Sequence, residues 1–211
     1  MSKSDYITFV EHGKKSAKRI LEKYHYLTGI SKGFKSGYNF VLFSNKLDRV
    51  VGVCIFTGFP VPELAKGCYG LKRDQQEGLF ELSRLCLDPE AQKEEHNLAS
   101  WFTASCMRKL RKLTLVKSIL SYADDGYHKG TVYQALNFKY YGLTAKKKDF
   151  WVLQDNGSYT KLSRGKTKGI AGEWRDRTRK HRYLITYDKK LNCQWEEQKH
   201  PVKSVINHHL D

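Results

Sequence analysis

The sequence lacks paired cysteines, long apolar runs and an apolar leader. Its five cysteines are widely spaced with no C-x-x-C pair, which disfavours both a zinc ribbon and a disulfide scaffold. Cys54 and Cys86 lie in apolar runs and are expected in the core. No stretch approaches the ~18 apolar residues of a membrane span, and the opening MSKSDYITFVEHGKK has no signal-peptide core. We therefore expect a soluble, cytoplasmic protein without a membrane partner.

What the chain has in excess is positive charge. Among its 211 residues are 38 Lys and Arg against 22 Asp and Glu, a formal net charge of +16. Such an excess favours a polyanionic partner, because neutralised phosphates release condensed counterions. The alternatives are generic solubility or association with the ribosome. The 40% hydrophobic and 13% aromatic content is enough for a packed core and excludes a disordered tail.

The hydrophobic periodicity predicts one β-α-β unit between two antiparallel hairpins. The expected elements are a helix over 16–26, a hairpin of strands 38–43 and 49–56, an irregular stretch over 59–76, a strand over 79–87, a helix over 97–113, a strand over 116–122, a helix over 131–136, a second hairpin of strands 138–145 and 149–155, and a strand over 181–188. This order predicts an α/β protein with a mixed (α+β) sheet. It matches the order of the acyl-CoA-dependent N-acetyltransferase (GNAT) fold.

The composition shifts near Ser158. Between Lys146 and Arg182 twelve Lys and Arg face four acidic residues, a net charge of +8. Aromatic residues such as Trp174 and Trp195 need burial. We therefore expect a catalytic domain over 1–157 and a basic C-terminal extension over 158–211 packed on it.

Polar residues gather at the expected ends of the β-α-β unit. Glu81 and Arg84 lie inside an apolar strand, where unpaired charges cost several kcal/mol. Asn97 and Ser100 begin the next helix, whose free N–H groups suit a cofactor's pyrophosphate, and Asp124 ends the next strand. Alternatively, Asn97 and Ser100 only cap the helix and Asp124 only closes a turn.

Two further groups could reach the same cleft. Tyr133, in the helix after Asp124, is placed to act as a general acid toward a leaving thiolate, or else it is half-buried packing. His25 and Tyr26 end the first expected helix, and His25 alternatively complements the helix dipole.

Several motifs together resemble the Mom family of bacteriophage DNA modification proteins. They are KYHYL (23–27), ELSRLCLDPEA (81–91), NLASWF (97–102), SYADDGYHKGTVYQALNFKYYG (121–142) and RKHRYL (179–184). The resemblance covers most of residues 16–185. It implies a phage-encoded enzyme of the host cytoplasm that adds a carbamoylmethyl group to the exocyclic N6 amine of adenine in double-stranded DNA. That group protects phage DNA from restriction.

The resemblance also implies site residues and cofactors. The functional positions fall on His25, Tyr26, Arg84, Ser100, Asp124 and Tyr133. Acyl-CoA is the expected cofactor, with Asn97, Ser100 and Glu81 beside it, and iron has been associated with the family, for which His25, Tyr26 and Asp124 are candidate ligands. The sequence has DPEAQKEEHNLAS where ordinary acetyltransferases have a glycine-rich pyrophosphate loop.

Two other functions are compatible with the sequence. One is a small-molecule or protein N-acetyltransferase of the same fold, and the other is a non-enzymatic nucleic-acid-binding module. For the DNA-modifying enzyme, the residues expected to hold phosphates are Arg175, Arg177, Arg179, Lys180 and Arg182.

Overall fold

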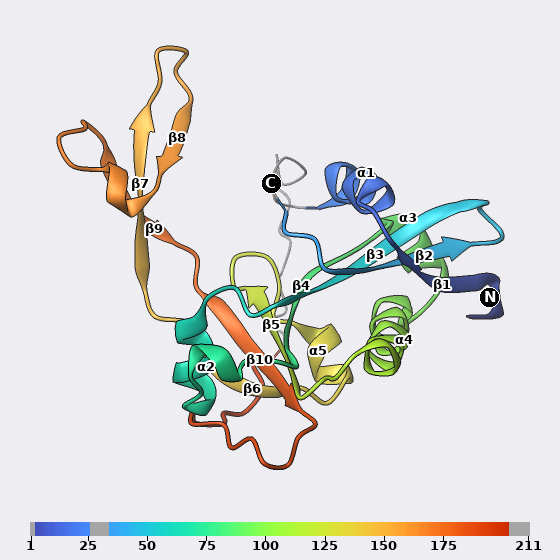
Figure 1. Cartoon of the computed structure of the whole chain (residues 1–211). Helices are drawn as coiled ribbons and strands as arrows, with labels where there is room; N and C mark the ends of the chain where they lie inside the picture. The colour runs from blue at the N-terminus through green and yellow to red at the C-terminus, as the bar shows by residue number, and fades with distance from the viewer. Residues whose placement is uncertain (1–2, 26–33, 203–211) are drawn as a thin grey trace.

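The computed structural model describes residues 3–25 and 34–202, and its largest element is a seven-stranded sheet (Figure 1). In spatial order its strands are β1 (Tyr6–Glu11), β2 (Tyr38–Ser44), β3 (Arg49–Gly58), β4 (Leu79–Leu87), β5 (Ser118–Asp124), β10 (Lys180–Thr186) and β6 (Lys139–Leu143). Neighbouring strands are antiparallel except for β4 and β5, which are parallel. The predicted mixed sheet with one β-α-β unit is confirmed.

Helices cover both faces of this sheet. On one face lie α1 (Lys15–Tyr24) and α2 (Pro62–Tyr69), and on the other lie α4 (Leu98–Leu113) and α5 (Thr131–Ala135), with α3 (Pro89–Glu94) leading into α4. Short 3-10 turns occupy Lys3–Asp5, Arg73–Gln75 and Arg164–Lys166. Because both faces are covered, β3 is buried along eight of its ten residues and reads as a continuous apolar run. We call this sheet with its helices the body.

A second sheet projects away from the body (Figure 1). Its strands are β7 (Lys147–Leu153), β8 (Tyr159–Leu162) and β9 (Glu173–Arg177), in the order β8-β7-β9. We call residues 147–177 the arm. Among the described residues of the arm, Phe150 is the only one with a buried side chain. The arm therefore has almost no core of its own, whereas the sheet of the body is covered on both faces.

The structure differs from the expected order in several places, and α3, β8 and β9 were not among the expected elements. The stretch expected to be irregular contains α2, because Pro62 sits in the first turn, where a proline starts a helix and does not break it. The expected second hairpin is wrong, since β6 pairs with β10 whereas β7 pairs with β8 and β9. The short edge strand β1 was not predicted from the sequence.

The chain also divides differently from the expected boundary at residue 157. That residue lies in the turn between β7 and β8, and β10 inserts between β5 and β6 in the main sheet. The C-terminal segment therefore completes the body, and the part that stands apart is the arm. Every described helix is too short or too polar to cross a lipid bilayer.

Candidate active site

A cleft opens where β4 and β5 diverge. The two strands pair only from Leu79–Leu82 against Ser118–Ser121, although they continue to Leu87 and Asp124. The space between them is a cavity of about 260 Å³. Its lining residues are Tyr24, His25, Leu82, Ser83, Arg84, Leu85, Cys86, Leu87, Gln92, Ala99, Tyr122, His128, Gly130, Val132 and Tyr133. It lies at the carboxyl ends of two parallel strands, where α/β sheets bind ligands.

A β-bulge in β4 directs Arg84 toward this cleft. Ile55 of β3 pairs with Arg84, whereas the next residue, Phe56, pairs with Leu82, so Ser83 is the extra residue. Strict alternation would place Glu81 and Arg84 on opposite faces of the sheet. The bulge brings both onto the face that α1 and α2 cover, and it interrupts the pairing beside the cleft.

Arg84 has an unused hydrogen-bond donor at the cleft. Its Nη1 donates to the Ser83 carbonyl at 2.6 Å. Its Nε is buried and has no hydrogen-bond partner among the described residues. A buried guanidinium N–H without a partner costs free energy that a ligand oxygen would recover. Arg84 is therefore the strongest ligand-directed group in the cleft.

His25 faces Arg84 across the cleft. It follows α1 with an extended backbone, so the helix ends at Tyr24, two residues before the expected end. Burial, reinforced by the charge of Arg84, lowers the pKa of His25 to about 4. Its imidazole is therefore neutral near pH 7 and able to accept a proton. Tyr26, expected beside it, lies outside the described residues.

The start of α4 forms a second cavity that continues the cleft. This cavity of about 160 Å³ is lined by Asn97 and Ser100 and shares Gln92, Ala99 and Val132 with the first. Asn97 has φ +59°, a left-handed conformation that asparagine tolerates, so the turn forms without glycine.

The polar groups at this helix start leave its amides available. Asn97 makes no side-chain cap, and the Ser100 hydroxyl donates to the Asn97 carbonyl at 3.0 Å. Within the described residues, the structure gives the amides of Ala99 and Ser100 no partner. The N-terminal end of α4 therefore keeps free N–H groups facing the cavity.

Tyr133 closes the α5 side of the cleft. It is 5% exposed and packs against Phe138 and Tyr183 at ring-centroid distances of 5.7 and 5.2 Å. Gly130 has φ +73°, and a Cβ there would lie 2.6 Å from the Tyr183 ring. This glycine lets the loop before α5 approach the aromatic cluster and orient Tyr133.

Asp124 lies beside the cleft but not on its lining. Its Oδ1 accepts from the Gly126 amide at 3.1 Å, and its Oδ2 accepts from the Thr178 hydroxyl at 3.0 Å. Both oxygens are thus engaged in closing the turn after β5 and in tying down the segment that leads out of the arm. The structure brings His25, Arg84 and Tyr133 into one cleft and Ser100 into the adjoining cavity, and places Asp124 behind them.

A buried polar chain that sequence reasoning missed holds the loop after β5. The Tyr140 hydroxyl and His181 Nδ1 are 2.8 Å apart, and His181 Nε2 lies 2.8 Å from Asp125 Oδ1. Because a carboxylate only accepts, Nε2 carries the proton and Nδ1 accepts from Tyr140. Hydrogen bonding to Lys129, and then to His181, lowers the pKa of Asp125, against the opposing effect of burial. The signal was present in RKHRYL, where His181 and Tyr183 alternate with Lys180 and Arg182 along a strand.

Glu81 is not among the residues that line the cleft. Register places it opposite Leu120 of β5, on the face of α1 and α2. Burial raises the pKa of Glu81, and the charges of Arg84 and Lys180 oppose that shift. Burial also lowers the pKa of Lys180. Glu81, expected beside a cofactor, therefore lies on the face of the sheet that α1 and α2 cover, outside the cleft and the cavity at the start of α4.

The five basic residues expected to hold phosphates divide between body and arm. Arg179 donates to the Thr144 carbonyl at 2.7 Å, Lys180 is half-buried, and Arg182 stacks over Trp195 at 4.5 Å. These three are committed to the body. Arg175 and Arg177 lie on β9 of the arm, where Arg177 is exposed.

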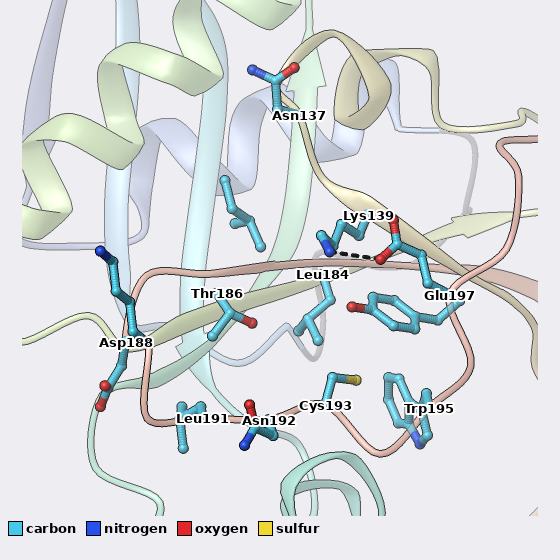
Figure 2. A pocket seen from close by; sticks show the side chains of 13 residues that line it. Asn137, Lys139, Leu184, Thr186, Asp188, Leu191, Asn192, Cys193, Trp195 and Glu197 are labelled. Atoms are coloured by element: carbon cyan, nitrogen blue, oxygen red, sulfur yellow. Dashed lines mark hydrogen bonds and ion pairs between the residues drawn. The ribbon is translucent and has the colours of Figure 1, made fainter.

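A cavity of about 590 Å³, larger than the cleft, is lined by residues of β6, β10 and the segment that follows β10 (Figure 2). Its rim includes the ion pair of Lys139 with Glu197 at 2.7 Å, and its floor includes Cys193, whose sulfur lies 3.8 Å from that of Cys68. None of the predicted site residues lines it. Its mixed polar wall carries no convergent set of groups, so we place the site in the smaller cleft.

The cleft fits an acyl-CoA better than a metal ion. The free amides at α4 suit a pyrophosphate, and the opening between β4 and β5 suits an extended acyl arm next to Arg84. Glu90, Glu94 and Glu95 in the preceding segment are unfavourable to phosphate. Among the described residues, no three His, Cys, Asp or Glu side chains are grouped to hold a metal ion. The iron ligands expected at His25 and Asp124 are therefore not supported.

Several solved structures similar to this chain are acetyltransferases. The ribosomal-protein-S18-alanine N-acetyltransferase from Escherichia coli matches with a TM-score of 0.52 at 11% identity, covering 87% of this chain and 94% of that one. A GNAT family acetyltransferase from Elizabethkingia anophelis, crystallised with acetyl-CoA, matches with a TM-score of 0.52 at 12% identity, covering 87% and 99%. An agmatine N-acetyltransferase also gives 0.52 at 12% identity, covering 86% and 100%. These matches confirm the predicted fold.

At the level of sequence, one family matches. A model of the Mom protein family aligns with residues 6–204, which spans both the body and the arm. None of the curated proteins compared with the chain matches it.

Proposed function

Because the chain belongs to the Mom protein family, we propose that it is a DNA-modifying transferase acting on the N6 amine of adenine in double-stranded DNA. The added group is carbamoylmethyl, its role is protection from restriction, and the site of action is the cytoplasm of a phage-infected host. The observation that carries this proposal is the family match over the residues that build the cleft. The net charge of +16 supports a polyanionic substrate.

The target adenine must leave the base stack to reach the cleft. Extruding a base costs a few kcal/mol, which aromatic and apolar contacts in a pocket recover. Tyr24, Tyr122 and Tyr133 line the cleft and supply such contacts. The amine then approaches the residues at the bulge of β4.

Arg84 and His25 have complementary tasks at this point. The guanidinium of Arg84, which lines the cleft and is not fully used by partners among the described residues, would donate to a carbonyl oxygen of the donor and stabilise negative charge that develops there. Neutral His25, held so by burial and by Arg84, is able to accept the proton that the amine loses. Tyr133 and the amides at the start of α4 orient the donor.

An acyl-CoA bound here would supply an activated carbon unit with a thiolate leaving group. Simple acyl transfer forms a bond from N6 to the carbonyl carbon and yields an amide. A carbamoylmethyl product instead needs a bond from N6 to the methyl carbon, with a C–H bond broken and two electrons passed to an oxidant. It also needs an ammonia-level nitrogen donor whose amine replaces the thiolate at the carbonyl carbon, so an oxidant and a nitrogen donor are co-substrates of the proposed reaction. The identity of the product therefore separates the proposed reaction from ordinary acetylation.

The test is to express the protein in cells, digest their DNA to nucleosides and determine the masses of the adenosine products. We expect deoxyadenosine carrying a carbamoylmethyl group, lost in Arg84→Gln and retained in Arg108→Gln, an exposed α4 residue outside the cleft. Acetylated amines or proteins with unmodified DNA would instead establish an N-acetyltransferase. If the protein binds DNA but forms no product, it acts as a non-enzymatic nucleic-acid-binding module.

A further inference from the structure

On the strands of the arm, each acidic side chain is paired with a Lys or Arg, and further Lys and Arg side chains have no acidic partner among the described residues. Asp149 pairs with Lys161 at 3.1 Å, Glu173 pairs with Arg175, and Asp176 lies 3.9 Å from Lys148. The cations without an acidic partner within the described residues are Lys147, Lys166, Lys168 and Arg177, all exposed. The arm as a whole has eight Lys and Arg against four acidic residues. Its free charge is therefore positive.

One face of the arm is organised around the side chain of Arg175. The guanidinium of Arg175 stacks 3.7 Å from the Tyr159 ring and 5.6 Å from the Trp151 ring, and it pairs with Glu173 on the same strand. Register places Lys147 directly opposite Arg177 on this face, because Asp149 pairs with Arg175 two residues away. Two free cations thus sit side by side on a preformed β-ribbon.

These two cations lie at the end of the arm nearest the cleft. Arg177 precedes Thr178, whose hydroxyl binds Asp124 at the end of β5. The amide of Asp125 donates to the Arg179 carbonyl at 3.0 Å. The loop that follows Asp125 supplies His128 and Gly130 to the cleft lining. The base of the arm is therefore fixed to the same loop that borders the candidate active site.

We propose that the arm is a duplex clamp: its face with Lys147 and Arg177 binds the sugar-phosphate backbone of double-stranded DNA and holds it across the mouth of the cleft. This inference rests on the proposed function and adds where the DNA lies. Contact is with phosphates, because the free groups on this face are cations, and neutralising phosphates releases condensed counterions whatever the base sequence. Lys166 and Lys168 extend the contact along the duplex.

The experiment measures affinity for a duplex of mixed sequence as a function of salt. Each lost phosphate contact lowers the slope of log affinity against log salt by about one. Lys147→Gln with Arg177→Gln should therefore lower that slope by about two. The matched control, Arg108→Gln with Lys112→Gln, removes the same charge from exposed positions on α4 and should keep the wild-type slope.

Every outcome bears on the clamp. An unchanged slope in the arm variant, or an equal loss in the α4 control, overturns it. If the arm variant does not fold, as judged by circular dichroism, Lys166→Gln with Lys168→Gln makes the same test. If the wild-type protein produces modified adenine but the arm variant keeps the wild-type salt slope, the proposed function holds and the clamp is wrong. If the salt slope falls in the arm variant but no modified adenine is found, the clamp holds and the proposed function is wrong.

Discussion

The body and the arm use polar side chains in opposite ways. In the body, polar groups are buried and given fixed partners, as in the chain from Tyr140 through His181 to Asp125. In the arm, charges are exposed, and those that pair do so in solvent. Buried hydrogen bonds fix geometry, whereas exposed ion pairs contribute little stability and leave charge available. Chemistry that needs positioned atoms therefore belongs in the body, and binding of a polyanion belongs on the arm.

The largest effect should separate turnover from binding. Arg84→Gln should lower kcat about 100-fold or more even at saturating DNA, because a preorganised donor at the reacting oxygen is lost. Lys147→Gln with Arg177→Gln should raise KM for DNA and leave kcat near wild type. Steady-state kinetics on duplex DNA measures both. A fall in kcat for the arm variant, or a change only in KM for Arg84→Gln, would contradict this division.

Stability should show the same contrast. His181→Ala removes a 3% exposed side chain and leaves Tyr140 and Asp125 without their shared partner, so we expect a loss of about 2–4 kcal/mol in unfolding free energy. Trp174→Ala on the arm removes a 49% exposed ring that contacts Phe150 and should cost about 1 kcal/mol or less. Urea denaturation measures both variants. Equal losses would mean that the arm is part of the cooperative core.

The same distinction explains what could be predicted from the sequence. The body strands and helices carry strong periodicity, so β4 over 79–87 was predicted at its observed bounds and α4 to within one residue. The arm has little periodicity, and short strands such as β8 depend on partners distant in sequence.

The site residues were harder to orient than to find. His25, Arg84, Ser100 and Tyr133 were identified and do line the cleft or its extension. The bulge at Ser83 was not predictable, because an extra residue is defined only by the register of β3 against β4. The engagement of Asp124 with Thr178 depends on β10 entering the main sheet, which local sequence does not encode.

Removing one hydrogen bond in the body and one ion pair on the arm should show a smaller difference in unfolding free energy. Tyr69, on α2, has its hydroxyl 2.6 Å from Ser118 Oγ and 2.7 Å from Thr186 Oγ1, inside the body. Tyr69→Phe leaves those groups underbonded and should cost about 1–2 kcal/mol. Lys161→Gln, which breaks an exposed pair with Asp149 on the arm, should change stability by less than about 0.5 kcal/mol. Thermal unfolding of both variants measures the difference, and a larger loss for Lys161→Gln would reverse the comparison.

The last expected effect is a pH dependence that the body has and the arm does not. His25 has a pKa of about 4 in the folded protein against its ordinary 6.5, so the unfolded chain binds the proton more tightly. The stability that neutral His25 contributes is complete above pH 6.5 and is lost as the pH falls toward 4. His25→Gln should therefore lose less stability than wild type between pH 7 and pH 4.5, as measured by melting temperature. The arm contains no histidine, so Trp174→Ala should retain the wild-type dependence. An identical decline in His25→Gln and wild type would show that His25 titrates normally and that the cleft does not hold it neutral.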